Sequence, residues 1–104
     1  GMCETDFSGY PDCRRDTLES LNTAINLGME SNLKIETPLM DITKGDSWRL
    51  LEKLASQEMV SFVNAGSHTC YKGVRETMHD WGYGCDDCPA CELRARGWRD
   101  YIST

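Results

Sequence analysis

The order of apolar and polar side chains predicts a first helix from Arg14 to Leu27. Its apolar positions, Leu18, Leu21 and Ile25, recur three or four residues apart and so share one helix face. Asp12 is the expected N-cap of this helix, and Gly28 is its expected end.

A short strand is expected next, because apolar and polar residues alternate from Leu33 to Thr37. Pro38 ends it and cannot donate to a sheet ladder, which favours a position at the edge of a sheet. A capping box from Thr43 to Asp46 then opens a second helix, whose apolar positions are Trp48, Leu51, Leu54 and Ala55.

The hydrophobic pattern after Ala55 is weaker. Met59 to Val63 predicts a brief extended segment, and Lys72 to Gly84 predicts a loop. Pro89 suits the first turn of a last helix, which we expect to run to Arg96 and to close at Gly97.

Length and composition describe a small globular chain. It has 104 residues, of which 39% are hydrophobic and 27% charged, with a formal net charge of −6. A chain of this length forms one domain or part of one. Its hydrophobic core is modest, so cross-links would add to its stability. The excess of acidic over basic residues argues against nucleic acid binding across the whole surface. No apolar run is long enough for a membrane span and no signal peptide is recognised, so we expect an intracellular protein.

Cysteine spacing carries the clearest chemistry. Cys85, Cys88 and Cys91 form a C-x-x-C-x-x-C pattern, and Cys70 stands fifteen residues before it. Three cysteines so close together suit thiolates that converge on one cation, and Cys70 completes a set of four. Four sulfur ligands with no open position describe a closed structural zinc site.

Other uses of these cysteines remain open at this point. An iron–sulfur cluster also takes four thiolates, and redox or disulfide chemistry is a further alternative. His68 or His79 could replace one cysteine as a ligand. Cys3 and Cys13 lie far from the pattern, and we expect them to be buried thiols outside the metal site.

Four blocks of this sequence resemble the 7-cyano-7-deazaguanine synthases, the ATP-dependent ligases of the queuosine pathway. The first is Cys3-Glu-Thr-Asp-Phe-Ser-Gly-Tyr-Pro-Asp-Cys13-Arg14, and the second is Thr37-Pro-Leu-Met40 with Thr43-Lys44. The third is His68-Thr-Cys70-Tyr71, and the last runs from Gly82 through the three cysteines to Gly97. The blocks keep the order of the family and span essentially the whole chain.

The resemblance covers only the later half of a typical family member. It implies an α/β fold in which residues 1–67 are the C-terminal part of a Rossmann-like PP-loop domain, with helices and a short edge strand. Residues 68–104 would then form a zinc-binding subdomain. The S-G-G-x-D-S loop that grips ATP phosphates belongs to the other half of the family and has no counterpart here, so we expect the chain by itself to be inactive.

Three local departures from the family pattern stand out. Asp86 takes the place of a glycine directly after Cys85, the second of the four cysteines, and aspartate tolerates the left-handed backbone conformation that glycine adopts easily. Asp41 replaces a large apolar residue, and Gly45 replaces an alanine at a helix start. These changes are typical of a divergent member.

The activity that the resemblance implies is the conversion of 7-carboxy-7-deazaguanine and ammonia to a nitrile, with ATP as co-substrate and Zn²⁺ as a structural ion. A guanine-like ring needs carboxylates for its N–H groups and flat side chains for stacking. The candidates for substrate binding are Glu4, Asp6, Phe7, Tyr10 and Asp12, together with Lys44 as a cation for phosphate or carboxylate. No catalytic residue is assigned. The family also implies a cytoplasmic homodimer.

A second class of function remains open, that of a stand-alone zinc module that binds a protein or RNA partner. Arg94, Arg96 and Arg99 form a small basic stretch, for which we expect a helix surface with pairs to Glu92 and Asp100. The tryptophans are expected to pack in a core or a lid.

Overall fold

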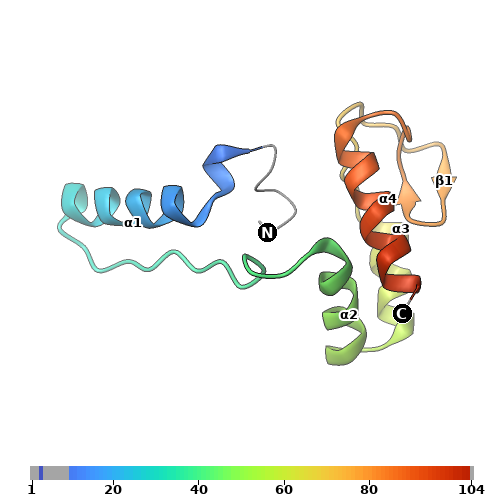
Figure 1. Cartoon of the computed structure of the whole chain (residues 1–104), viewed down its shortest axis with the longest axis horizontal. Helices are drawn as coiled ribbons and strands as arrows, with labels where there is room; N and C mark the ends of the chain where they lie inside the picture. Colours follow the sequence, from blue (N-terminus) through green and yellow to red (C-terminus); the bar gives the residue numbers. More distant parts are fainter. Residues whose placement is uncertain (1–2, 4–9, 104) are drawn as a thin grey trace. The chain divides into compact units, whose positions relative to one another are not determined.

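The computed structural model describes Cys3 and residues 10–103. The chain divides into two compact units, Gly1–Ile42 and Thr43–Thr104 (Figure 1). The helices between 44 and 66 therefore belong to the same unit as the cysteine pattern. The boundary expected between residues 67 and 68 stays a prediction about the domains of the whole family protein.

The first unit begins with a 3-10 helix, η2 (Pro11–Cys13), followed by α1 (Arg15–Met29). The prediction of Asp12 as the N-cap is wrong, because Asp12 lies inside η2 and the cap residue is Arg14, which makes no side-chain capping bond. Pro11 occupies the first position of η2, where its restricted φ favours a tight turn. The Thr17 hydroxyl donates to the Pro11 carbonyl at 2.8 Å and ties the two helices together.

The end of α1 also differs from the prediction, since Gly28 lies within the helix. Glu30 is the C-cap, in the left-handed conformation at φ 49°, and its N–H donates to the Asn26 carbonyl. The Asn26 side chain accepts from the Ser31 hydroxyl at 2.9 Å and from the Leu33 N–H at 2.8 Å. These contacts of Asn26 hold the chain as it leaves the helix.

The segment predicted as a strand, Leu33 to Thr37, is not one. Within the described residues it has no neighbouring strand. Side chains of α1 form hydrogen bonds with its backbone instead. The Asn22 amide oxygen accepts from the Ile35 N–H at 2.7 Å, and the Asn26 amide donates to the Leu33 carbonyl at 2.8 Å. The alternating pattern therefore produces an extended chain laid along a helix.

The second unit begins with α2 (Lys44–Leu54), and its capping box is confirmed. The Asp46 N–H donates to the Thr43 hydroxyl at 3.1 Å, while the Thr43 N–H donates to the Asp46 carboxylate at 3.2 Å. The two bonds satisfy donors that the first turn of a helix otherwise leaves without partners.

The extended segment predicted from Met59 to Val63 is helical instead. It belongs to α3 (Gln57–Gly66), which begins where the Ser56 hydroxyl accepts from the Met59 N–H at 3.2 Å. Val60 and Asn64, four residues apart, are the buried positions of this helix. The serine cap and the buried face therefore favour a helix more strongly than the β-branched residues of this stretch favour an extended conformation.

A small antiparallel hairpin, β1 (Met78–His79) and β2 (Gly82–Tyr83), interrupts the predicted loop and precedes α4 (Pro89–Ile102). The predicted end of α4 at Gly97 is wrong, because Gly97 lies inside the helix and faces α2. A Cβ atom on Gly97 would stand 2.7 Å from the Lys44 Cβ and 3.3 Å from the Gly45 nitrogen. Gly97 is thus a packing residue that lets two helices cross closely.

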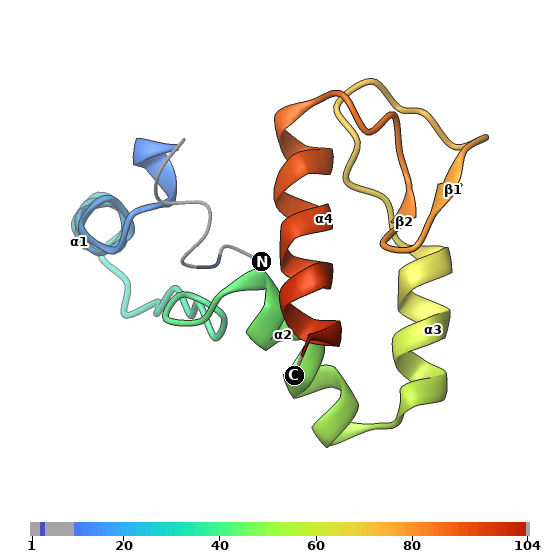
Figure 2. The ribbon, with the colours of Figure 1, turned by 45° about the vertical axis from the view of Figure 1, so that its right-hand side comes forward.

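Helices α2 and α4 pack against each other (Figure 2), and aromatic side chains fill the contact between them. The Trp48 and Trp98 rings meet edge to face, with centroids 5.0 Å apart, and Trp98 lies 5.3 Å from the Tyr101 ring. Trp81 is buried beside the cysteines, so all three tryptophans pack as expected. Helices with a small two-stranded sheet confirm the mixed α/β class, although the strands lie at 78–83.

Candidate metal centre

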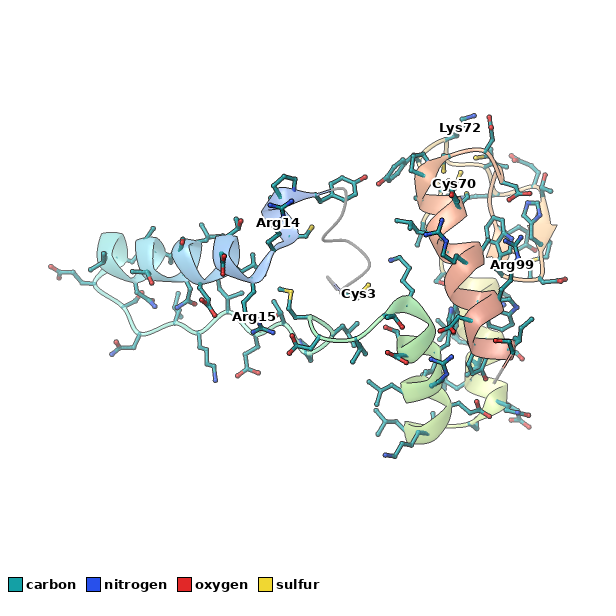
Figure 3. The ribbon with its side chains drawn as sticks, in the orientation of Figure 1. Cys3, Arg14, Arg15, Cys70, Lys72 and Arg99 are labelled. Atoms are coloured by element: carbon teal, nitrogen blue, oxygen red, sulfur yellow. The ribbon has the colours of Figure 1, made fainter. Side chains whose placement is uncertain are left out.

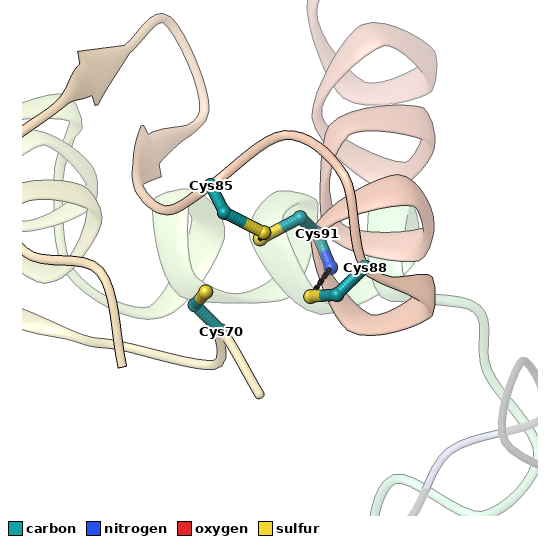
Figure 4. A group of neighbouring side chains, drawn as sticks. All are labelled: Cys70, Cys85, Cys88 and Cys91. Atoms are coloured by element: carbon teal, nitrogen blue, oxygen red, sulfur yellow. Dashed lines mark hydrogen bonds between the residues drawn. The ribbon is translucent and has the colours of Figure 1, made fainter. Parts of the chain in front are cut away.

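Four cysteines converge at one end of the second unit (Figure 4). Cys70 follows α3, Cys85 follows β2, Cys88 is the N-cap of α4, and Cys91 lies in its first turn. Their sulfur atoms all lie within 4.8 Å of one another. Because Cys70 comes from a separate loop, a shared ligand would join that loop to α4.

The sulfur spacing fits a tetrahedral metal ion. Zinc–sulfur bonds of about 2.3 Å place tetrahedral sulfur atoms about 3.8 Å apart. The sulfurs of Cys85 and Cys91 are 3.9 Å apart, far beyond the roughly 2.0 Å of a disulfide. Among the described residues no disulfide forms. The four cysteines can therefore hold one ion with no position open to a substrate.

Main-chain N–H groups point at the sulfur atoms, as thiolates require. The Asp87 N–H donates to Cys85 Sγ at 3.3 Å, and the Cys91 N–H donates to Cys88 Sγ at 3.4 Å. Burial by itself disfavours ionisation of Cys70, but the N–H groups of Val74, Cys85 and Lys72 together lower its pKa to about 6. Cys70 is thus ready to bind metal at neutral pH.

Cys91 is the most deeply buried ligand, and no part of it is exposed. Burial raises the pKa of its thiol to about 12, despite the opposing N–H groups of Asp86 and Cys85. Without metal this thiol keeps its proton at neutral pH, so an arriving cation must displace it.

The loop between the ligands is held by two further features. Asp86 has φ 60°, so aspartate does adopt the left-handed geometry at the position where the family pattern has glycine. Lys72 Nζ lies 2.7 Å from the Asp87 carboxylate and links the Cys70 loop to the Cys85 loop. Figure 3 shows Lys72 beside Cys70, where α4 begins.

The histidines that were alternative ligands are engaged elsewhere. His68 Nε2 lies 2.8 Å from the Val74 carbonyl, and His79 Nε2 lies 3.0 Å from the Gly84 carbonyl. The His79 ring also stacks on Trp81, with centroids 4.4 Å apart. The structure therefore favours four cysteines over three cysteines and a histidine.

The predicted substrate-binding residues are placed only in part. Glu4, Asp6 and Phe7 lie outside the described residues, while Tyr10 and Asp12 are exposed on either side of Pro11. Lys44 is the first residue of α2 and is half-buried. Cys3 is buried and Cys13 is half-buried, and neither belongs to the four-cysteine group. The shared role of these residues in substrate binding stays a prediction.

Arg94 differs from its predicted place. The sequence pattern predicts the helix surface, but Arg94 is only 5% exposed. Its position three residues after Cys91, on the same face of a helix, was the available signal. Arg96 does pair with Glu92, at 3.0 Å, whereas Asp100 pairs with Arg49 of α2, at 3.0 Å.

Comparison with known proteins returns one family. The family model described as queuosine biosynthesis protein QueC matches residues 1–102. The 7-cyano-7-deazaguanine synthases of Janthinobacterium sp. (strain Marseille) and Herminiimonas arsenicoxydans are 58% and 56% identical to this chain over 103 residues. That of Zymomonas mobilis is 56% identical over 101 residues.

These matches cover nearly all of this chain but only part of the relatives. The first two include 99% of this chain and 44% of the relative, and the third includes 97% and 40%. The chain corresponds to the C-terminal part of these proteins.

Proposed function

From the premise that this chain belongs to the QueC family of queuosine biosynthesis proteins, we propose that it is the C-terminal part of a 7-cyano-7-deazaguanine synthase. The reaction is the ATP-dependent conversion of 7-carboxy-7-deazaguanine and ammonia to the nitrile. The match of a family model to residues 1–102 is the observation that carries this proposal. We place the enzyme in the cytoplasm.

The metal in this proposal is one structural zinc ion held by Cys70, Cys85, Cys88 and Cys91. Four thiolate ligands leave no position for a reacting group, so the ion would support the fold and take no part in the reaction. The core of the second unit is built on three of these cysteines together with Trp81 and Ala95, which makes its stability depend on the bound ion.

Substrate recognition is assigned to the segment from Glu4 to Asp12, with Lys44 as a cation. Asp12 lies in η2 and makes no capping bond to α1, so its carboxylate is not committed to holding that helix. Tyr10 is exposed beside it and offers a flat ring for stacking. ATP binding is assigned to the part of the family protein that this chain does not match.

The first unit supports a role within a larger assembly. Its helix α1 has no buried residue, and Leu27 is 76% exposed. Leu21, Met29 and Leu33 are also exposed apolar residues of this unit. Surfaces of this kind are normally covered by another part of a protein, which agrees with an ATP-binding half and with the homodimer typical of the family.

A chimaera tests the proposed function. This chain replaces the matching part of the Janthinobacterium synthase, and nitrile formation is measured with ATP, ammonia and 7-carboxy-7-deazaguanine. We expect ATP-dependent activity from the chimaera and none from the isolated chain. A folded chimaera without activity, beside an active parent enzyme, would contradict the assignment.

Two variants of the chimaera test the substrate-binding segment. Asp6→Ala and Asp12→Asn are expected to lower turnover far more than they lower the melting temperature. Asparagine keeps the shape of aspartate but cannot present two acceptor oxygens to a guanine-like edge. Full activity in both variants would contradict the assignment to this segment and would indicate that the other half of the enzyme recognises the substrate.

A further inference from the structure

A buried arginine lies next to the cysteine cluster without a carboxylate partner. Arg94 is 5% exposed, and among residues 3 and 10–103 it forms no ion pair with an aspartate or glutamate. A guanidinium stays charged at any physiological pH. A charge withdrawn from water is strongly unfavourable unless an opposite charge lies nearby, so the fold has to provide one.

The geometry places Arg94 one helical turn after Cys91, one of the proposed ligands. Two glycines, Gly82 and Gly84, lie two residues apart along the chain and both face α4. A Cβ atom on Gly84 would stand 2.6 Å from Cys91 Sγ, and one on Gly82 would stand 3.0 Å from Arg94 Cζ. Cys91 and Arg94 are therefore neighbours along one stripe of α4, covered by the same short segment.

Hydrogen bonds from Arg94 reach two other segments of the chain. Its Nε donates to the Trp81 carbonyl at 2.7 Å, and its Nη2 donates to the Asn64 carbonyl at 3.0 Å. Asn64 precedes Cys70 in the sequence and Trp81 precedes Cys85, so one side chain ties both ligand-bearing segments to α4. The guanidinium also lies 5.9 Å from the centre of the Trp48 ring of α2.

The charge of a loaded site supplies the missing partner. Four thiolates around one divalent cation leave a net charge of about −2. Burial lowers the pKa of Arg94, and the negative charge of Cys91 opposes that effect. Acidic groups nearby, Asp86 and Asp87, are exposed to solvent and so are poor substitutes for the buried thiolates.

We propose that Arg94 is the internal counter-charge and positioning residue of the four-cysteine metal site, so that it controls how durably the metal is held. The inference rests on the structural metal of the proposed function. It goes further in assigning a role to a residue that is not itself a ligand. Metal loading and burial of Arg94 stabilise each other, because the loaded site carries a net negative charge and the guanidinium carries a positive one.

The test compares zinc release from three variants of the whole zinc-loaded chain. Arg94→Gln removes the charge and keeps a hydrogen-bonding group, Arg94→Lys keeps the charge, and Arg96→Gln is the matched control on the exposed face of the same helix. The rate of zinc transfer to a chromogenic chelator is measured. The absorption of the cobalt-substituted proteins reports whether four thiolates still bind.

We expect Arg94→Gln to release zinc at least about tenfold faster than the original chain, since breaking a buried charge pair is strongly unfavourable. Arg94→Lys should stay within about threefold and Arg96→Gln within about twofold, because an exposed pair contributes little. A folded Arg94→Gln protein that releases zinc at the original rate would overturn the proposal. So would Arg94→Lys releasing zinc tenfold faster, and this comparison suffices if Arg94→Gln does not fold.

Failure of the underlying metal assignment looks different. If the unaltered chain is purified without about one equivalent of zinc and does not take it up, the metal site of the proposed function is wrong. If the unaltered chain holds zinc and the Arg94 variants hold it equally well, only the role of Arg94 is wrong.

Discussion

Substitution of Gly84 by alanine would disturb the proposed metal site without replacing a proposed ligand. A Cβ atom at this position would stand 2.6 Å from Cys91 Sγ and 2.9 Å from two atoms of the Trp81 ring. Comfortable contacts between such atoms are about 3.5–4.0 Å. One of the three groups must therefore move by about 1 Å to admit the methyl group.

Neither neighbour can move freely. Trp81 is 4% exposed and stacks on His79, while Cys91 is fully buried in the first turn of α4. Metal–ligand distances tolerate changes of only about 0.2 Å. Overpacking of a tight interior typically costs about 1–3 kcal/mol, which corresponds to a loss of roughly 5- to 150-fold in metal affinity if it falls on the bound state.

Competition with a chelator of known affinity measures this loss for zinc, and cobalt absorption measures the ligand geometry. Gly66→Ala is the control, because this glycine is the last residue of α3 in the same unit and an added Cβ meets nothing within 4 Å. The control should bind zinc as the original chain does. Equal zinc affinity and superimposable cobalt spectra for Gly84→Ala would refute the close packing of Gly84 against Cys91.

Two further contacts of the second unit can be tested in the same chain. Gly97→Ala should lower the melting temperature, at a cost of about 1–3 kcal/mol, because its Cβ would stand 2.7 Å from the Lys44 Cβ of α2; a melting temperature equal to that of Gly66→Ala would contradict this. The Tyr101 hydroxyl donates to Glu52 at 2.7 Å, and this bond raises the Tyr101 pKa above its usual value. The contact therefore stabilises the fold below about pH 10 and is lost as the pH rises further. In an ultraviolet titration Tyr101→Phe should remove a phenol whose pKa lies above the usual value, and Glu52→Gln should make this phenol ionise earlier; an unchanged titration would refute the assignment.

Local features of the fold were predictable because their partners lie within a few residues. The capping box joins Thr43 to Asp46, and Cys88 begins α4 directly before Pro89. The grouping of the four cysteines was predictable from their number and spacing, whereas their role as zinc ligands stays a prediction. The resemblance to a synthase family rested on blocks of sequence, and the comparisons confirm it.

The sequence by itself therefore determined the family, the grouping of the four cysteines and the capping box between Thr43 and Asp46. Only the tertiary structure decided that Gly97 lies inside a helix, that Leu33 to Thr37 runs along α1 with no strand partner among the described residues, and that Arg94 is buried. Each of these outcomes depends on groups far away in the sequence, such as Lys44 for Gly97 and Asn64 for Arg94. Propensity and periodicity describe one segment at a time, whereas burial is set by whichever other segment packs against it.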